Sequence, residues 1–188
     1  MVAVLKILAD REKFVTMPSK LKIGRQAWLW FLLALLVLVA DQLTKSWIVA
    51  QFSYGSSEAI TSFFNLVRVH NYGAAFSFLN NEGGWQRWGF TFFAVLVSLV
   101  ILVWITRLSA QQRLEGFALA FILGGALGNL YDRVTLGYVV DFLDFHWSGR
   151  HFPAFNIADS AISVGAVLIL VEGFLKRPDG DPKSKNKD

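Results

Sequence analysis

Four long apolar stretches constrain what this chain can fold into. An α-helix rises 1.5 Å per residue, so about 20 mostly apolar residues cross the hydrocarbon core of a membrane. Only 17% of the 188 residues are charged, whereas a soluble domain carries about 25%. We therefore predict an α-helical integral membrane protein with four transmembrane helices, at residues 27–50, 88–105, 116–131 and 155–175.

The two long connecting segments, residues 51–87 and 132–154, have the character of a β-sheet. Residues 63–78 mix β-branched and aromatic side chains with short alternation, and residues 138–147 alternate weakly. Turns are expected near Gly73 and at 83–84. Both segments lie on the same side of a four-span protein. We predict that residues 51–87 form a small β-rich platform on the membrane, and that part of residues 52–87 acts as a lid over a functional site on that side.

Positive charge predicts the orientation. With four spans, 13 of the 18 Lys and Arg residues fall on the side of the two termini. Positive residues concentrate in cytoplasmic loops, so we expect cytoplasmic termini and an extracytoplasmic platform. The net charge of +4 follows from this asymmetry and does not indicate nucleic-acid binding. We expect a basic extension (1–26), a membrane domain (27–175) and a charged tail (176–188).

Two acids, Asp141 and Asp159, are the leading candidates for chemistry. Asp159 lies at the mouth of the last apolar stretch, where an ionisable group is costly and typical of a functional site. Carboxylates about 4 Å apart repel by roughly 4 kcal/mol at a dielectric constant of about 20, so one retains a proton. Such a pair can activate water against an amide carbonyl. The spacing alone leaves open that the two acids are unrelated.

Other reaction classes have less support. The chain has no cysteine, which excludes a thiolate nucleophile, and its three histidines lack the spacing of a metal-binding HExxH motif. We therefore expect neither a metal nor a cofactor.

Several polar residues are candidates for supporting such a pair. Asp41 and Lys45 are spaced i,i+4 in the first apolar stretch, and they form either a solvated ion pair or a brace for the site. If the third helix continues, Asn129, Asp132 and Arg133 share one face. Arg133 then pairs with Asp132 or Asp41, or holds a substrate.

Five motifs in order resemble the lipoprotein signal peptidase (signal peptidase II) family, four-span aspartic endopeptidases of bacterial membranes. They are DQLTK (41–45), NYGAAFSF (71–78), GNLYDR (128–133), VVDF (139–142) and FNIADS (155–160). The resemblance implies catalytic roles for Asp141 and Asp159. It implies supporting roles for Asp41, Lys45, Asn71, Asn129, Arg133 and Asn156. We add Gly125 to the supporting set; it lies within the small-residue pair Gly124 and Gly128, which lets another helix approach closely.

The resemblance also implies a substrate and a location. The family's substrates are prolipoproteins with a diacylglyceryl-modified cysteine, cleaved on the amino side of that cysteine. We accordingly expect a monomer in contact with lipid, in the bacterial inner membrane, with its site at the periplasmic face. Two alternatives are a proton-coupled transporter that uses Asp41, Asp141 and Asp159 as relay sites, and a non-catalytic scaffold. Four spans without an inverted repeat argue against the transporter.

Overall fold

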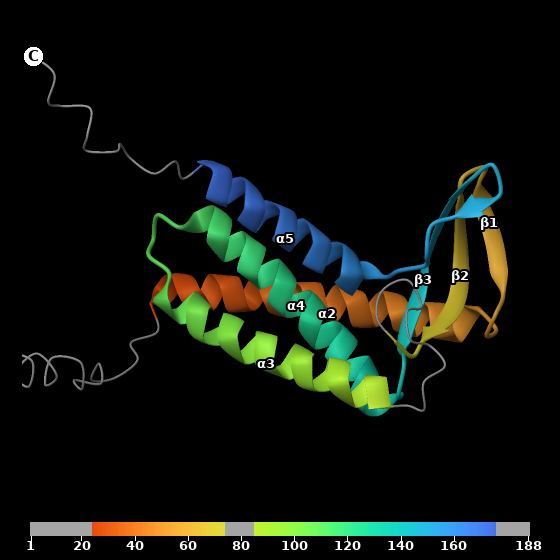
Figure 1. The fold of residues 1–188 in the computed structure, drawn as a ribbon, viewed down its shortest axis with the longest axis horizontal. Helices are drawn as coiled ribbons and strands as arrows, with labels where there is room; N and C mark the ends of the chain where they lie inside the picture. The colour runs from red at the N-terminus through yellow and green to blue at the C-terminus, as the bar shows by residue number, and fades with distance from the viewer. Residues whose placement is uncertain (1–23, 74–84, 176–188) are drawn as a thin grey trace, which may run out of the picture.

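Four helices and a four-stranded sheet make up the computed structural model, which describes residues 24–73 and 85–175 (Figure 1). Each helix is long and apolar enough to cross a membrane, and together they confirm the predicted four-helix membrane fold. The described part of the chain begins and ends at the same end of the bundle, opposite the sheet (Figure 1). The helices are α2 (Arg25–Gln51), α3 (Trp85–Arg107), α4 (Arg113–Thr135) and α5 (Ile157–Leu175).

Helix α4 is the central helix of the bundle. In the most apolar 18-residue stretch of α4, 61% of the residues are buried, whereas the corresponding share in the other three helices is 17–22%. Helix α4 packs against all three of them. Glycines make this close packing possible. A Cβ atom on Gly124 would lie 2.5 Å from the carbonyl oxygen of Ala34 in α2, and one on Gly125 would collide with that of Ala158 in α5. The small residues of the third apolar stretch therefore admit a helix on each side.

The outer faces of the other helices are strongly apolar. Large side chains are exposed along them, as a hydrocarbon solvent favours and water does not. Examples are Leu32 and Leu36 on α2, Phe92 and Phe93 on α3, and Leu170 on α5.

The sheet is antiparallel, with the strand order β1–β2–β3–β4. It joins the two predicted β segments, because Asn71 pairs with Val139 and Val69 with Asp141. A strand at 57–61 was not predicted. The expected turn at 83–84 and residues 74–84 of the segment expected to hold the lid lie outside the described residues. The strands are β1 (Ser57–Thr61), β2 (Phe64–Asn71), β3 (Val139–Trp147) and β4 (Arg150–His151).

A small apolar core fixes the sheet against the helices. Ile48 near the end of α2 is buried with Val140 and Phe142 of β3, and Ile157 at the start of α5 packs against them. Val140 and Phe142 flank Asp141, so the packing of its two neighbours holds this acid at the junction of sheet and bundle.

Candidate active site

The two candidate acids lie on different elements that meet at this junction. Asp141 is in β3, and Asp159 is in the first turn of α5. The segment before α5 pairs with β3: the Phe155 amide donates to the Leu143 carbonyl at 3.1 Å, and the Leu143 amide donates to the Phe155 carbonyl at 2.8 Å. This pairing places the start of α5, with Asp159, beside the strand that carries Asp141.

Asn156 contacts both acids. Its side-chain nitrogen donates to Oδ1 of Asp141 at 2.7 Å. Its side-chain oxygen accepts the backbone N–H of Asp159 at 2.9 Å, and its own N–H donates to Oδ2 of Asp159 at 3.4 Å. The last two bonds are the reciprocal pair of a capping box, here with Asn and Asp in place of Ser and Glu. The device that starts α5 therefore also orients the two carboxylates.

Two further amides complete the contacts of the acids. Asn71 donates to Oδ2 of Asp141 at 3.0 Å, and Asn129 donates to Oδ1 of Asp159 at 2.7 Å. All four carboxylate oxygens thus accept a hydrogen bond, and the side-chain donors are neutral. Hydrogen bonds from neutral donors orient a carboxyl group and favour its charged form. They do not add a positive charge, which would favour the ionised form more strongly.

Burial opposes the ionisation of Asp141. The residue is 2% exposed, and this burial, together with the nearby charge of Asp159, raises its pKa from 3.8 to about 7. The bonds from Asn71 and Asn156 act in the opposite direction but do not outweigh the burial. Asp141 therefore retains a proton into the neutral range, as one member of a proton-sharing pair must.

A buried ionic cluster lies behind the acids. The Lys45 ammonium is 2.8 Å from Oδ2 of Asp41 and 2.9 Å from Oδ2 of Asp132. It also donates to Oδ1 of Asn129 at 2.9 Å, so its three N–H groups each have an acceptor. The pair of Asp41 and Lys45 is buried rather than solvated. The interpretation as a solvated ion pair is therefore wrong, and the brace is the interpretation that remains.

The cluster also binds the backbone beside each acid. Oδ1 of Asp41 accepts the N–H of Ala158 at 2.9 Å, and Oδ2 of Asp132 accepts the N–H of Val140 at 3.2 Å. Ala158 and Val140 directly precede Asp159 and Asp141. The same buried ions thus anchor both segments that carry the acids.

Two members of the cluster, Asp132 and Gln42, were given no role of their own in the sequence-based site; Asp132 was considered only as a neighbour of Asn129 and Arg133 on one helical face. Asp132 pairs with Lys45, and the side-chain nitrogen of Gln42 donates to Oδ1 of Asp132 at 2.9 Å and to the Gly128 carbonyl at 3.2 Å. Both lie inside quoted motifs, and Asp132 lies three residues after Asn129 on the same helical face. That spacing was the available signal for Asp132.

Arg133 forms neither of the ion pairs considered for it within the described residues. Its guanidinium donates to the carbonyls of Asn129 and Gly73, each at 3.3 Å, and it lies 5.7 Å from the ring centre of Phe90. The third alternative, a contact with a substrate, remains, because Arg133 lines a cavity that Asp159 also lines.

That cavity has a volume of about 540 Å³ and two chemically distinct parts. Its polar end is formed by Asn71, Asn129, Arg133 and Asp159. The remainder is mostly apolar and is formed by the 152–155 segment and α5, including Phe152, Phe155, Ile162 and Val164. Asp141 is not among the lining residues; it contacts the lining through Asn71. The arrangement suits a ligand with a peptide portion at Asp159 and a hydrocarbon portion along α5. In the part of the chain that the structure describes, no group of three or more acidic or histidine side chains is placed to hold a metal ion.

Gly125, also predicted to support the site, acts through packing. It faces the backbone of α5 at Ala158 and the side chain of Ile162, one turn from Asp159. Its missing side chain allows α5 to approach α4.

Comparisons with known proteins give a consistent result. The family described as Signal peptidase (SPase) II matches residues 33–175. The lipoprotein signal peptidase of Cellvibrio japonicus is 50% identical over 158 residues, which are 84% of this chain and 92% of that protein. The lipoprotein signal peptidase of Serratia proteamaculans is 52% identical over 160 residues, 85% of this chain and 94% of that protein. A solved structure of a bacterial membrane enzyme, 31% identical, superposes with a TM-score of 0.70 over 82% of this chain and 94% of that one.

Proposed function

Since the chain belongs to the signal peptidase II family, a family of membrane hydrolases that process lipoproteins, we propose that it is an aspartic endopeptidase with Asp141 and Asp159 as its catalytic pair. The substrate of this proposal is a prolipoprotein whose cysteine carries a diacylglyceryl group. The bond that breaks is the peptide bond on the amino side of that cysteine.

The reaction follows from two acids that share one proton. The ionised carboxylate removes a proton from a water molecule, and the water oxygen attacks the carbonyl carbon of the scissile bond. The protonated carboxyl group donates its proton to the oxyanion. When the C–N bond breaks, the leaving nitrogen takes up a proton from one carboxyl group, and the other carboxylate takes a proton from a hydroxyl group of the collapsing tetrahedral intermediate, which leaves as the carboxylic acid product. The pair then holds one proton again, and because the two groups titrate together neither is assigned a separate role.

One observation carries this proposal: Asn156 contacts both carboxyl groups, through 2.7 Å and 3.4 Å bonds. Two acids that were merely neighbours in the fold would not need a common orienting residue. The pKa of Asp141, raised to about 7 by burial and by the charge of Asp159, supports a protonated group at neutral pH.

The cavity supports the substrate class. Its polar end can bind a peptide backbone through Arg133 and the two amides, and its apolar part can accept acyl chains along α5. The charge asymmetry of the sequence supports cytoplasmic termini, so we place the site at the outer face of the inner membrane. We further propose that the protein acts as a monomer. Membership of a hydrolase family favours this function over a transporter that uses the same acids.

The test is cleavage of a defined substrate by the purified full chain. A synthetic prolipoprotein peptide carrying diacylglyceryl-cysteine is incubated beside an unmodified copy, and the products are identified by mass spectrometry. We expect two products from the modified peptide, one of which begins with the modified cysteine, and little product from the control. Cleavage at another bond, or equal cleavage of both peptides, would refute the proposed specificity.

A further inference from the structure

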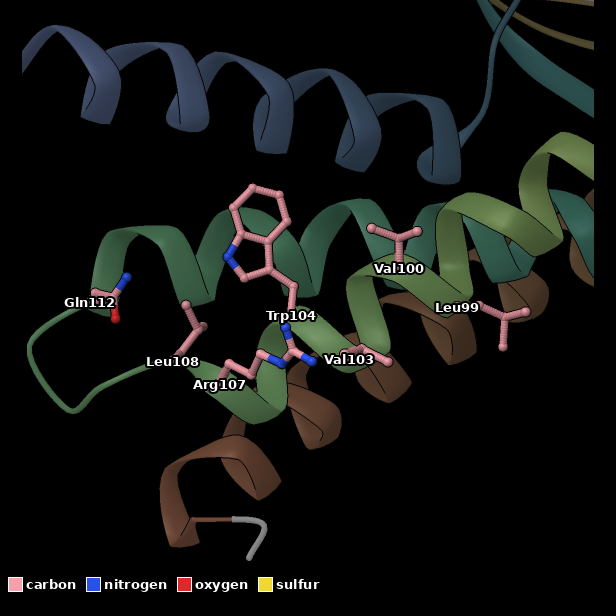
Figure 2. A pocket seen from close by; sticks show the side chains of 7 residues that line it. All are labelled: Leu99, Val100, Val103, Trp104, Arg107, Leu108 and Gln112. Carbon is pink, nitrogen blue, oxygen red and sulfur yellow. The ribbon is translucent and has the colours of Figure 1, made fainter. Parts of the chain in front are cut away.

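A second cavity lies along α3 at the end of the bundle away from the sheet and the acids. Its volume is about 660 Å³, larger than that of the cavity at the acids. Figure 2 shows its side chains on α3, with Leu108 and Gln112 where the chain turns toward α4. No step of the proposed reaction uses these residues. We call this cavity the α3 groove.

The wall of the α3 groove is a hydrocarbon surface. Leu99 and Val103 are four residues apart, as are Val100 and Trp104, so these side chains share one face of the helix. From Leu99 to Arg107, the last residue of α3, the groove extends about 12 Å along the helix axis, the length of a substantial part of an acyl chain. Helix α3 is long and apolar enough to span a membrane, and only 17% of the residues in its most apolar stretch are buried inside the protein. In a membrane this wall therefore faces lipid rather than protein.

The aromatic part of the wall is held in place. The indole nitrogen of Trp104 donates to Oε1 of Glu115 at 2.8 Å, and Gln112 donates to the other carboxylate oxygen at 2.7 Å. Glu115 belongs to α4 and is 7% exposed. The Trp104 ring is thus fixed across the two helices, so the groove does not depend on a ligand to orient it.

The end of the groove carries a positive charge. Arg107 is the last residue of α3 and is exposed, and the structure gives it no ion pair within the residues it describes. Its position at the end of a transmembrane helix is the depth at which lipid headgroups lie. A guanidinium group binds phosphate through two parallel hydrogen bonds.

We propose that the α3 groove binds one anionic diacyl phospholipid, with an acyl chain along the apolar wall and the phosphate on Arg107. The apolar wall matches the acyl chain of such a lipid, and Arg107 at the end of the wall matches its phosphate group. Charge complementarity selects an anionic lipid over a zwitterionic one, whose ammonium group would bring a second positive charge to Arg107. The proposal does not depend on the proposed peptidase reaction.

The test measures lipid retention by the purified full chain. Intact-protein mass spectrometry is performed after incubation with dioleoyl phosphatidylglycerol or dioleoyl phosphatidylcholine at equal concentration. We expect one phosphatidylglycerol molecule per chain, retained about tenfold more strongly than phosphatidylcholine. The variant Arg107→Gln should lose this preference. A cation in the last turn also stabilises a helix, so the readout is the preference between lipids and not stability.

The matched control is Arg113→Gln, which removes a charge at the same end of the bundle but outside the groove lining. It should keep the preference; an equal loss in both variants would mean general electrostatic attraction and would overturn the proposal. Val103→Trp, which fills the groove, should weaken retention of phosphatidylglycerol, and unchanged retention would place the lipid elsewhere. Water-soluble glycerol phosphate should not displace the lipid. Full displacement would indicate a phosphate site rather than a lipid site.

Discussion

The side-chain nitrogen of Asn156 lies 2.7 Å from a carboxylate oxygen of Asp141, 15 positions earlier in the chain. Asn156 also caps the helix that carries Asp159. The relative position of the two acids therefore depends on how α5 begins, and the same hydrogen bonds serve the fold and the proposed chemistry.

The hydrogen bond from Asn71 affects the pKa of Asp141, and through it the titration of the acid pair. This bond lowers the pKa of Asp141, so Asn71→Ala should raise the pKa further above its value of about 7. Above this pKa both acids are ionised and no proton donor remains, so cleavage declines. The alkaline decline of kcat/KM should therefore move to higher pH by roughly one unit, since a hydrogen bond to a charged group contributes about 1.5–3 kcal/mol.

Asn65→Ala is the matched control for this measurement. Asn65 lies on the same strand, but its amide donates to Asp144 at 2.8 Å rather than to Asp141. Its pH profile should keep the position of the wild-type profile. A shift to lower pH in Asn71→Ala would show that this amide does not favour the ionised form of Asp141.

Lys45 should be essential for stability. The variant Lys45→Met leaves Asp41 and Asp132 buried together without the cation that both contact, and removing one partner of a buried ion pair costs about 3–5 kcal/mol. We expect a marked fall in the thermal unfolding temperature in detergent. Adding Asp132→Asn removes one of the two uncompensated charges and should recover part of the loss. A single variant as stable as the wild type would contradict the bracing role.

Gly125→Ala should disturb α5 at the turn that carries Asp159. The added methyl group would collide with the backbone oxygen of Ala158, which cannot rotate away as a side chain can. Such overpacking costs about 1–3 kcal/mol, and we expect lower stability and a lower cleavage rate. Gly173→Ala on α5 is the control, because its methyl group would meet no atom within 4 Å and alanine favours a helix. Equal effects of the two changes would rule out the packing explanation.

The sequence predicted the helices well because the membrane requires long apolar stretches. It also placed a strand in residues 63–78 and another in residues 138–147, since β-branched and aromatic residues alternate there. The strand Ser57–Thr61 was missed because all five residues are exposed and show no alternation between a buried and an exposed face. This segment forms a strand because it pairs with β2, and that pairing cannot be read from its own composition.

The partners of the charged residues were harder to predict. Spacing placed Asp132 and Arg133 on one helical face, but it could not show that Lys45 of another helix accepts Asp132 as a partner. The contact of Asp141 with Asn156 joins a strand to the start of a helix, and no periodicity links those elements. Local spacing constrains contacts within a helix; contacts between elements depend on packing, here on the glycines of α4.

The most direct test of the proposed acid pair is cleavage by Asp141→Asn and Asp159→Asn, made separately, with Asp144→Asn as the control. Asp144 is also buried in β3, but it bonds to Asn65 and His151 and does not belong to the pair. The rate of product formation from the lipidated peptide is measured by mass spectrometry for chains that remain folded. We predict a loss of at least about 100-fold in each variant of the pair and near-normal cleavage in the control. Substantial cleavage by either Asp141→Asn or Asp159→Asn would contradict the paired-acid mechanism.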